Sequence, residues 1–268
     1  MSIETIFSVR GKTAIVTGGA SGIGLAIVEA LAENGASVAI IDRDTERLAN
    51  EQARLAALDL QVRAYEADVA DQSQIASVIA AATEALGGLD IIFANAGITG
   101  GYGPASTHTN AGAFENFDIE VWNRTIDVNL SGVIHTLRAA LPALKQRQAG
   151  KIIVTSSIAG LRANTAIGYP YTASKTALVN LIKTLALELA HSNIQVNGLA
   201  PGPFHTNINK GRFHDPSNAA LAASSVPLGR LARPDEIKGL ALLLASSASS
   251  YITGAVIPID GGKTAGGI

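Results

Sequence analysis

Short apolar segments alternate with helical patterns along the whole chain, and this alternation restricts the fold more than any other feature. Seven short apolar runs lie at residues 12–17, 36–41, 60–67, 89–94, 151–156, 194–200 and 255–259. Strands buried on both faces read as nearly continuous apolar runs, and a strand–helix–strand order gives parallel pairing with right-handed crossovers. The sequence therefore predicts an α/β fold: a doubly wound, parallel seven-stranded sheet with helices on both faces.

The helices are expected between these segments, and several carry start signals. Asp44 and Asp71 stand where N-cap residues are found, ahead of two of the helical patterns. No linker or shift in composition interrupts the alternation, so residues 1–268 are predicted to form one domain. The six expected helices span 22–34, 44–57, 71–86, 118–147, 171–190 and 234–247.

Two long stretches, 98–117 and 203–231, fall outside the alternation. Loops of this length in a compact domain are usually lids or binding loops. Ligands of open parallel sheets lie outside the carboxyl ends of the strands, and both loops leave from that edge. We expect them to form the walls of a substrate site; surface loops without a ligand role are the alternative.

Composition excludes several classes of protein and site. The 20 basic and 22 acidic residues give a formal net charge of -2, which argues against a polyanion-binding protein. The absence of cysteine excludes disulfides, thiolate nucleophiles and cysteine-ligated metals. The five histidines show no paired metal-ligand spacing, so no metal is expected. The N-terminus is not a secretory signal and no apolar run could span a membrane, so we expect a cytoplasmic protein.

The first apolar segment ends in the glycine-rich stretch "TGGASGIG", residues 17–24. Its glycines allow a tight turn and close approach of a pyrophosphate, and the helix that opens there presents free N–H groups and the positive end of its dipole. A plain strand-to-helix turn is the alternative, but the position after the first strand favours dinucleotide binding. The predicted contacts are Gly18, Ser21, Gly22, Ile23 and Gly24.

Asp42 ends the second apolar segment, 18 residues after Gly24. A carboxylate at that position can accept hydrogen bonds from both ribose hydroxyls, and it would repel a 2′-phosphate. Asp42 therefore favours NAD over NADP. Arg43 could turn toward a phosphate, so NADP remains an alternative, and a solvated turn residue is the non-functional interpretation of Asp42.

The segment "YPYTASKTA", residues 169–177, contains two of the five tyrosines and one lysine. If it is helical, Tyr171 and Lys175 are four residues apart and share a face. Tyr169 precedes Pro170 and is predicted to lie in the approach to the helix. Taken alone, Tyr171 and Lys175 could be a surface pair or a catalytic pair.

Taken together, the motifs resemble the short-chain dehydrogenase/reductase family. The resemblance runs from end to end and comprises "TGGASGIG", "ADV" (67–69), "NAG" (95–97), "VN" (128–129), "SS" (156–157), "YTASK" (171–175), "PGPFHT" (201–206) and "ITGAVIPIDGG" (252–262). It implies a Rossmann fold that oxidises alcohols or reduces carbonyls with a nicotinamide dinucleotide, commonly as a homotetramer. A tyrosine suits the proton transfer only if its pKa, about 10 in water, is brought toward neutrality, and three units cost about 4 kcal/mol.

The resemblance also implies the catalytic roles. Ser157 would bind the substrate oxygen, Tyr171 would be the general acid or base, Lys175 would lower the pKa of Tyr171 and bind ribose hydroxyls, and Asn129 would hold a water that links Lys175 to solvent. Ser157 precedes Tyr171 by fourteen residues, one more than is common in the family, so we expect an extra residue in the intervening loop. Ser156 remains the alternative.

Further cofactor contacts follow from the same resemblance. Asp68 and Val69 would flank the adenine. Asn95, Ala96 and Gly97 would border the adenosine ribose. Pro201, Gly202 and Thr206 would border the nicotinamide. Tyr171 and Lys175 would contact the cofactor as well.

The expected reaction interconverts a small to medium secondary alcohol and its ketone with NAD. An NADP-dependent carbonyl reductase of the same fold and a catalytically inactive dinucleotide-sensing protein are the alternatives. Arg162, Lys210 and Arg212 are candidates for binding an anionic group of the substrate.

Overall fold

Seven parallel strands form one sheet in the order β3-β2-β1-β4-β5-β6-β7. The computed structural model describes residues 2–105 and 110–266, without the side chains of 111, 209, 210 and 212. The architecture confirms the predicted doubly wound parallel sheet. Its strands are β1 Thr13–Thr17, β2 Ser37–Asp42, β3 Val62–Glu66, β4 Ile91–Ala94, β5 Gly150–Thr155, β6 Ile194–Pro201 and β7 Val256–Ile259.

The strand order reverses at β1, which pairs with β2 on one side and β4 on the other. Ala14 is level with Val38 of β2 and with Ile91 of β4. In such sheets the crevice for a ligand opens outside the carboxyl ends of the strands at the point of reversal. The residues that follow Thr17 and Ala94 are therefore the first to be considered for a site.

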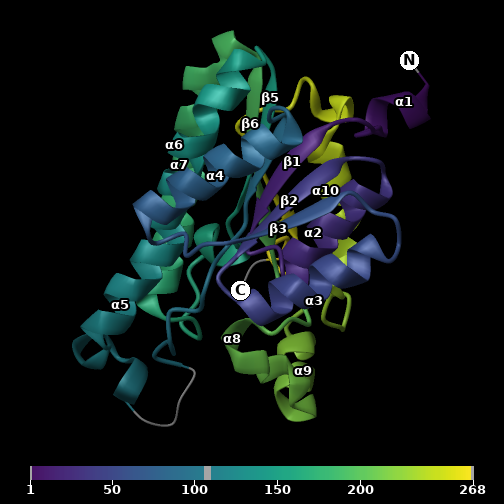
Figure 1. Ribbon diagram of the computed structural model, residues 1–268. Helices are drawn as coiled ribbons and strands as arrows, with labels where there is room; N and C mark the ends of the chain where they lie inside the picture. The colour runs from purple at the N-terminus through teal and green to yellow at the C-terminus, as the bar shows by residue number, and fades with distance from the viewer. Residues whose placement is uncertain (1, 106–109, 267–268) are drawn as a thin grey trace.

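Helices cover both faces of the sheet (Figure 1). The side chains of α4, α6 and α7 belong to one buried apolar cluster and those of α2, α3 and α10 to another. No helix among the described residues is long and apolar enough to cross a membrane. The helices are α1 Ile3–Phe7, α2 Gly22–Glu33, α3 Thr45–Ala56, α4 Gln72–Leu86, α5 Ile119–Ile126, α6 Gly132–Gln146, α7 Tyr169–Leu189, α8 Ile208–Gly211, α9 Pro216–Ser224 and α10 Lys238–Ala245.

The helix expected over 118–147 is interrupted. A π-helical segment, η3, spans Asp127–Ser131 between α5 and α6. Asn129 inside it is fully buried, and its side chain is bonded to the backbone of Ile98. π-turns of this kind often occur at functional sites, and here the contact to Ile98 comes from a distant part of the chain.

Tyr169 lies in a helix, so the prediction that it precedes the helix was wrong. Helix α7 begins at Tyr169 with Gly168 as its N-cap. Pro170 is accommodated because the first turn of a helix has N–H groups without intrahelical partners. The Tyr169 ring contacts Phe114 and Phe117 of the preceding long loop, with centroids 5.3 and 5.9 Å away.

Short helices occupy both long loops. The segment 203–231 contains α8 and α9, of which α9 is capped by the Asp215 side chain and has Pro216 in its first turn. Of the 98–117 loop, residues 106–109 lie outside the described residues. The 3₁₀ helices are η1 Asn110–Gly112, η2 Phe114–Asn116, η4 Ile158–Gly160, η5 Ala190–Ser192, η6 Arg212–His214, η7 Pro234–Ile237 and η8 Ser247–Ser249.

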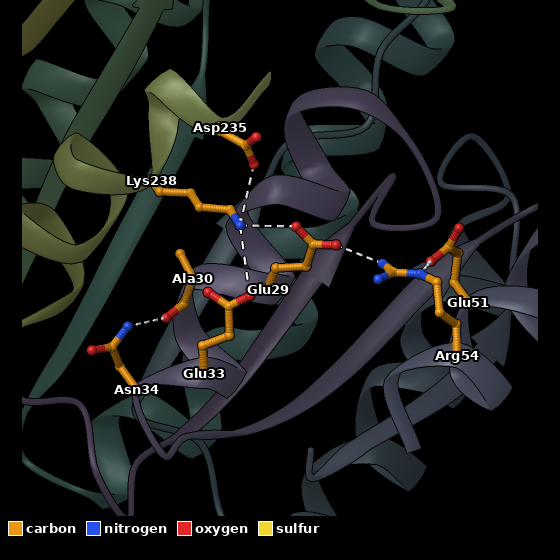
Figure 2. A network of polar contacts seen from close by, with 8 residues as sticks. All are labelled: Glu29, Ala30, Glu33, Asn34, Glu51, Arg54, Asp235 and Lys238. Atoms are coloured by element: carbon orange, nitrogen blue, oxygen red, sulfur yellow. Dashed lines mark hydrogen bonds and ion pairs between the residues drawn. The ribbon is translucent and has the colours of Figure 1, made fainter. Parts of the chain in front are cut away.

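An ion-pair network joins α2, α3, η7 and α10 on the α2 face of the sheet (Figure 2). Glu29 of α2 accepts from Arg54 of α3 at 2.5 Å and from Lys238 of α10 at 2.9 Å. Lys238 also lies 3.2 Å from Asp235 and 3.7 Å from Glu33. The network therefore attaches α3 and α10 to α2.

Candidate active site

The turn between β1 and α2 is shaped by glycines that cannot carry a side chain. Gly18 and Gly22 have φ values of +65° and +55°, and a Cβ on Gly24 would collide with the carbonyl oxygen of Gly18. Ser21, the N-cap of α2, makes no side-chain capping bond, and the first turn has no acidic residue. The N–H groups and positive end of α2 therefore have neither a capping side chain nor an acidic residue of the helix's own first turn, and this glycine cradle fits the pyrophosphate of a dinucleotide.

Asp42 lies beside this cradle at the carboxyl end of β2. One carboxylate oxygen accepts a hydrogen bond from Ala20 N at 3.2 Å, and the other accepts from Arg43 N at 2.8 Å and Asp44 N at 3.2 Å. These backbone donors fix the orientation of the carboxylate. The structure thus brings Asp42 and the glycine turn together as the sequence predicted.

Asp68 and Val69 follow β3 and are tied to the neighbouring helices. The Asp68 carboxylate forms an ion pair of 2.6 Å with Arg124 of α5, and Gly132 of α6 packs closely against Val69. Burial alone would raise the pKa of Asp68, but the hydrogen bonds from Arg124 and the Ala70 amide outweigh it, and the pKa is lowered. Sequence reasoning missed Arg124, because nothing in its helix indicates a partner fifty-six residues earlier.

Asn95 connects the carboxyl ends of three strands. Its backbone N donates to Thr17 Oγ1 and its Nδ2 to Thr17 O, both at 3.1 Å, while Thr155 Oγ1 donates to Asn95 Oδ1 at 3.0 Å. Ala96 N also donates to Thr17 Oγ1, at 3.3 Å. This Asn95 bridge holds the ends of β1, β4 and β5 in one arrangement at the base of the crevice.

Lys175 of α7 reaches the same edge of the sheet. Its ammonium donates to Thr155 O at 2.8 Å, and the side chain is only 3% exposed. A Cβ on Gly97 would lie 3.5 Å from Lys175 Nζ, so Gly97 lies in contact distance of the ammonium. No carboxylate of the described chain pairs with Lys175, and burial lowers its pKa to about 8.

Tyr171 lies one turn before Lys175, whose Nζ is 5.7 Å from the centre of the phenol ring. Burial raises the pKa of Tyr171, and a hydrogen bond with Ser157 opposes that rise. The chain by itself therefore does not lower the pKa of the Tyr171 phenol toward neutral pH. A lowered pKa would need more positive charge than Lys175 supplies at this distance.

Of the two serines after β5, Ser157 is the one beside Tyr171. Ser157 Oγ accepts from Ala159 N at 3.1 Å. Ser156 Oγ donates instead to Lys175 O at 2.9 Å in a buried contact with α7. Strand alternation predicted that consecutive side chains point to opposite faces, and the two hydroxyls are engaged in that way.

Asn129 lies next to Gly97, where a Cβ would come within 3.3 Å of its Oδ1. Its Oδ1 accepts from Ile98 N at 2.8 Å, and its Nδ2 donates to Ile98 O at 2.9 Å. A weaker bond of 3.4 Å reaches Ser174 Oγ on α7. The Asn129 side chain therefore connects the π-helical segment to the strand end and to the helix that carries Tyr171 and Lys175.

The segment after β6 closes the other side of the glycine turn. Thr206 is buried, and a Cβ on Gly22 would lie 3.3 Å from its side chain. Pro201 ends β6, and Gly202 lies close against Asp260 of the C-terminal segment. Within residues 2–105 and 110–266, no group of three or more His, Asp or Glu side chains could hold a metal ion.

Residues 18–264 match a family model described as "Enoyl-(Acyl carrier protein) reductase". The chain is a short-chain dehydrogenase/reductase. It is 35% identical over 260 residues to the rhamnolipids biosynthesis 3-oxoacyl-[acyl-carrier-protein] reductase of Pseudomonas aeruginosa, with 96% of this chain and 97% of the relative covered. It is 38% identical over 259 residues to the 3-alpha-(or 20-beta)-hydroxysteroid dehydrogenase of Mycobacterium tuberculosis, covering 96% and 90% of the two chains.

Solved structures agree with this assignment. A short-chain type dehydrogenase/reductase from Mycobacterium marinum superposes with a TM-score of 0.89 at 36% identity, over 99% of this chain and 100% of the other. A gluconate 5-dehydrogenase from Burkholderia cenocepacia, solved with NADP and tartrate, gives a TM-score of 0.90 at 32% identity with the same coverage. This short-chain dehydrogenase/reductase is accordingly an oxidoreductase that uses a nicotinamide dinucleotide and acts on CH–OH or carbonyl groups.

Proposed function

We propose that the protein interconverts small to medium secondary alcohols and their ketones, with NAD as the preferred cofactor. The observation that carries the proposal is the meeting of Ser157, Tyr171 and Lys175 at the carboxyl edge of the sheet. There the Ser157 hydroxyl bonds Tyr171, and the Lys175 ammonium lies over the phenol ring. The glycine turn of β1 opens at the same edge.

In the proposed oxidation, Tyr171 removes the proton from the alcohol oxygen, and Ser157 holds that oxygen by a hydrogen bond. A dinucleotide held at the glycine turn would supply the oxidised, positively charged nicotinamide as acceptor for the hydride of the carbinol carbon. Lys175 contributes positive charge and would donate hydrogen bonds to ribose hydroxyls. Asn129 would hold a water beyond Lys175. Because the Asn129 side chain is bonded to Ile98, its main chain would have to bind this water.

Replacing the phenol tests the proton transfer directly. Tyr171→Phe should lower kcat/KM by about 10²–10⁴-fold, the usual contribution of a general acid or base, while the affinity for the dinucleotide is largely retained. Tyr169→Phe is the matched control, because the same hydroxyl is removed two residues away. Near-wild-type turnover by Tyr171→Phe would remove the proposed role.

The preference for NAD is supported by the Asp42 carboxylate, which the backbone donors of Ala20 and Arg43 hold beside the cradle. NADP is the second candidate, because the gluconate 5-dehydrogenase and the Pseudomonas aeruginosa protein RhlG were solved with NADP. Arg43 would then face the 2′-phosphate.

Asp42→Asn keeps the shape and an acceptor oxygen but removes the negative charge. The ratio of kcat/KM for NAD to that for NADP should fall about tenfold or more in this variant, since a charge facing a 2′-phosphate is worth on the order of 1.4 kcal/mol. Steady-state rates with both cofactors give the ratio. A wild-type enzyme that already prefers NADP would contradict the proposal.

We propose further that the chain forms one domain, acts as a cytoplasmic homotetramer and binds the dinucleotide with the residues named above. The family resemblance supports the tetramer. Light scattering of the purified protein measures its mass directly.

A further inference from the structure

A pocket of about 190 Å³ lies between the loop after β5 and the C-terminal segment. Its walls include Ile158, Ala159, Arg162, Ser225, Lys263 and Thr264. The backbone N of Ala159, in that wall, donates to the hydroxyl of Ser157 at 3.1 Å. The pocket wall therefore touches the group proposed to hold the reacting oxygen, and Ser225 brings the segment 203–231 into the same wall.

Two cationic side chains face this pocket without a carboxylate partner. Arg162 Nη1 donates to Lys263 O at 3.1 Å and to Gly266 O at 2.9 Å, which fixes the guanidinium against the C-terminal segment. Its Nε and Nη2 groups have no acceptor among the described residues. Lys263 Nζ donates to Ser225 Oγ at 2.6 Å, a neutral group.

Asp260 is the acidic residue nearest to Lys263 in sequence, and its carboxylate already accepts other hydrogen bonds. It accepts from Gly262 N at 3.0 Å and from both Thr264 N and Thr264 Oγ1 at 2.7 Å, so it closes the turn of the C-terminal segment. Burial lowers the pKa of Lys263, and the charge of Asp260 only partly opposes this. Neither Arg162 nor Lys263 forms an ion pair within the part of the chain that the structure describes.

We infer that this pocket binds a carboxylate of the substrate, so that the substrate pair is a hydroxy acid and its oxo acid. A fixed guanidinium with free N–H groups matches the two oxygens of a carboxylate, and a neighbouring ammonium adds a second charge. At about 190 Å³ the pocket is large enough for several waters, and so for a carboxylate on a short linker. The inference rests on the proposed function and narrows its substrate class.

The test compares matched acids and esters. Rates of NAD reduction are measured with a series of hydroxy acids of increasing chain length, beginning with 3-hydroxybutyrate, and with their methyl esters. The wild-type enzyme should prefer the acids. In Arg162→Gln and in Lys263→Met the acid-to-ester ratio of kcat/KM should fall about ten- to a hundredfold, the usual worth of a charged hydrogen bond.

The control variant is Lys145→Met, which removes an exposed lysine from the last turn of α6. Its acid-to-ester ratio should equal that of the wild type. If Arg162 served only to hold the C-terminal segment, its loss would lower the rates for acid and ester together and leave the ratio unchanged. That result, or a wild-type preference for the esters, would overturn the inference.

The absence of a carboxylate site in the pocket and the failure of the proposed function would give different results. Turnover of esters but not of acids removes the carboxylate site and keeps the oxidoreductase. If neither is turned over with NAD or NADP, the proposed function fails, and calorimetric titration with succinate, which has no alcohol to oxidise, still decides on the pocket. Binding to the wild type that is lost in Arg162→Gln supports the site, and no binding to the wild type overturns it.

Discussion

Two lysines show how differently the two faces of the sheet accommodate a positive charge. Lys238 on the α2 face lies within 4 Å of Glu29, Glu33 and Asp235 (Figure 2). Burial alone would lower its pKa, but the hydrogen bonds to Glu29 and Asp235 prevail, and the pKa is raised. Lys175, on the opposite face, is almost fully buried with a carbonyl as its hydrogen-bond partner, and its pKa falls to about 8.

The difference separates a region that holds the fold together from a region that holds a reactive group. Around Lys238 every charge meets an opposite charge, and the result is attachment of one helix to another. An ammonium buried without a carboxylate destabilises the folded state, so its presence requires a reason other than folding. The pairing of charges, not their burial alone, is what distinguishes the two regions.

The largest effect on activity is expected from removing Lys175. Lys175→Met should lower kcat/KM by about a hundredfold or more, because the positive charge beside the phenol is lost. The free energy of unfolding should not decrease, since a buried charge has been replaced by an apolar chain of similar length. Steady-state kinetics and urea denaturation measure the two effects, and retained activity would show that the ammonium is not needed.

The unpaired charge of Lys175 should also appear in the pH dependence of the protein's stability. The pKa of Lys175 is about 8 in the folded protein and 10.5 when unperturbed, so the unfolded chain binds more protons between these values. Stability attributable to Lys175 should therefore rise with pH from about 8 to 10.5, by about 1.4 kcal/mol per pH unit and about 3 kcal/mol in total.

The measurement is the difference in unfolding free energy between wild type and Lys175→Met at several pH values. Lys151, whose pKa burial also lowers to about 8, is present in both proteins and cancels. A difference that does not change between pH 7.5 and 9.5 would mean that the Lys175 pKa is not depressed in the folded protein.

The smallest effect is expected at the paired lysine. Lys238→Met should cost about 1 kcal/mol of stability or less, because partly exposed ion pairs contribute little each. The loss should shrink in high salt, and kcat/KM should remain at the wild-type value. A large fall in activity would show that the α2 face and the active site are coupled.

Much of the fold was predictable because each buried strand appears in the sequence as an apolar run. The π-helical segment at Asp127–Ser131 was not, since it depends on the bond between Asn129 and Ile98, which lie far apart in sequence. The same holds for the ion pair of Arg124 with Asp68. Helix α9 has a readable start signal in the sequence, because Asp215 can cap it and Pro216 suits its first turn.

The candidate site was predicted as a set of residues rather than as an electrostatic environment. Ser157, Tyr171 and Lys175 meet as expected, and Asp42 lies at the glycine turn. The raised pKa of Tyr171 could not be read from the sequence, because it arises from desolvation of the phenol in the folded chain.

The Asn95 bridge has a consequence for how damage to this enzyme would be noticed. One amide side chain fastens the ends of β1, β4 and β5, and those ends are also the floor on which the dinucleotide would rest. A change at this position would weaken cohesion of the sheet and affinity for the coenzyme together. Added coenzyme would then partly restore the heat resistance of such a variant, and the lesion would be mistaken for a simple folding defect whenever the coenzyme was left out of the assay.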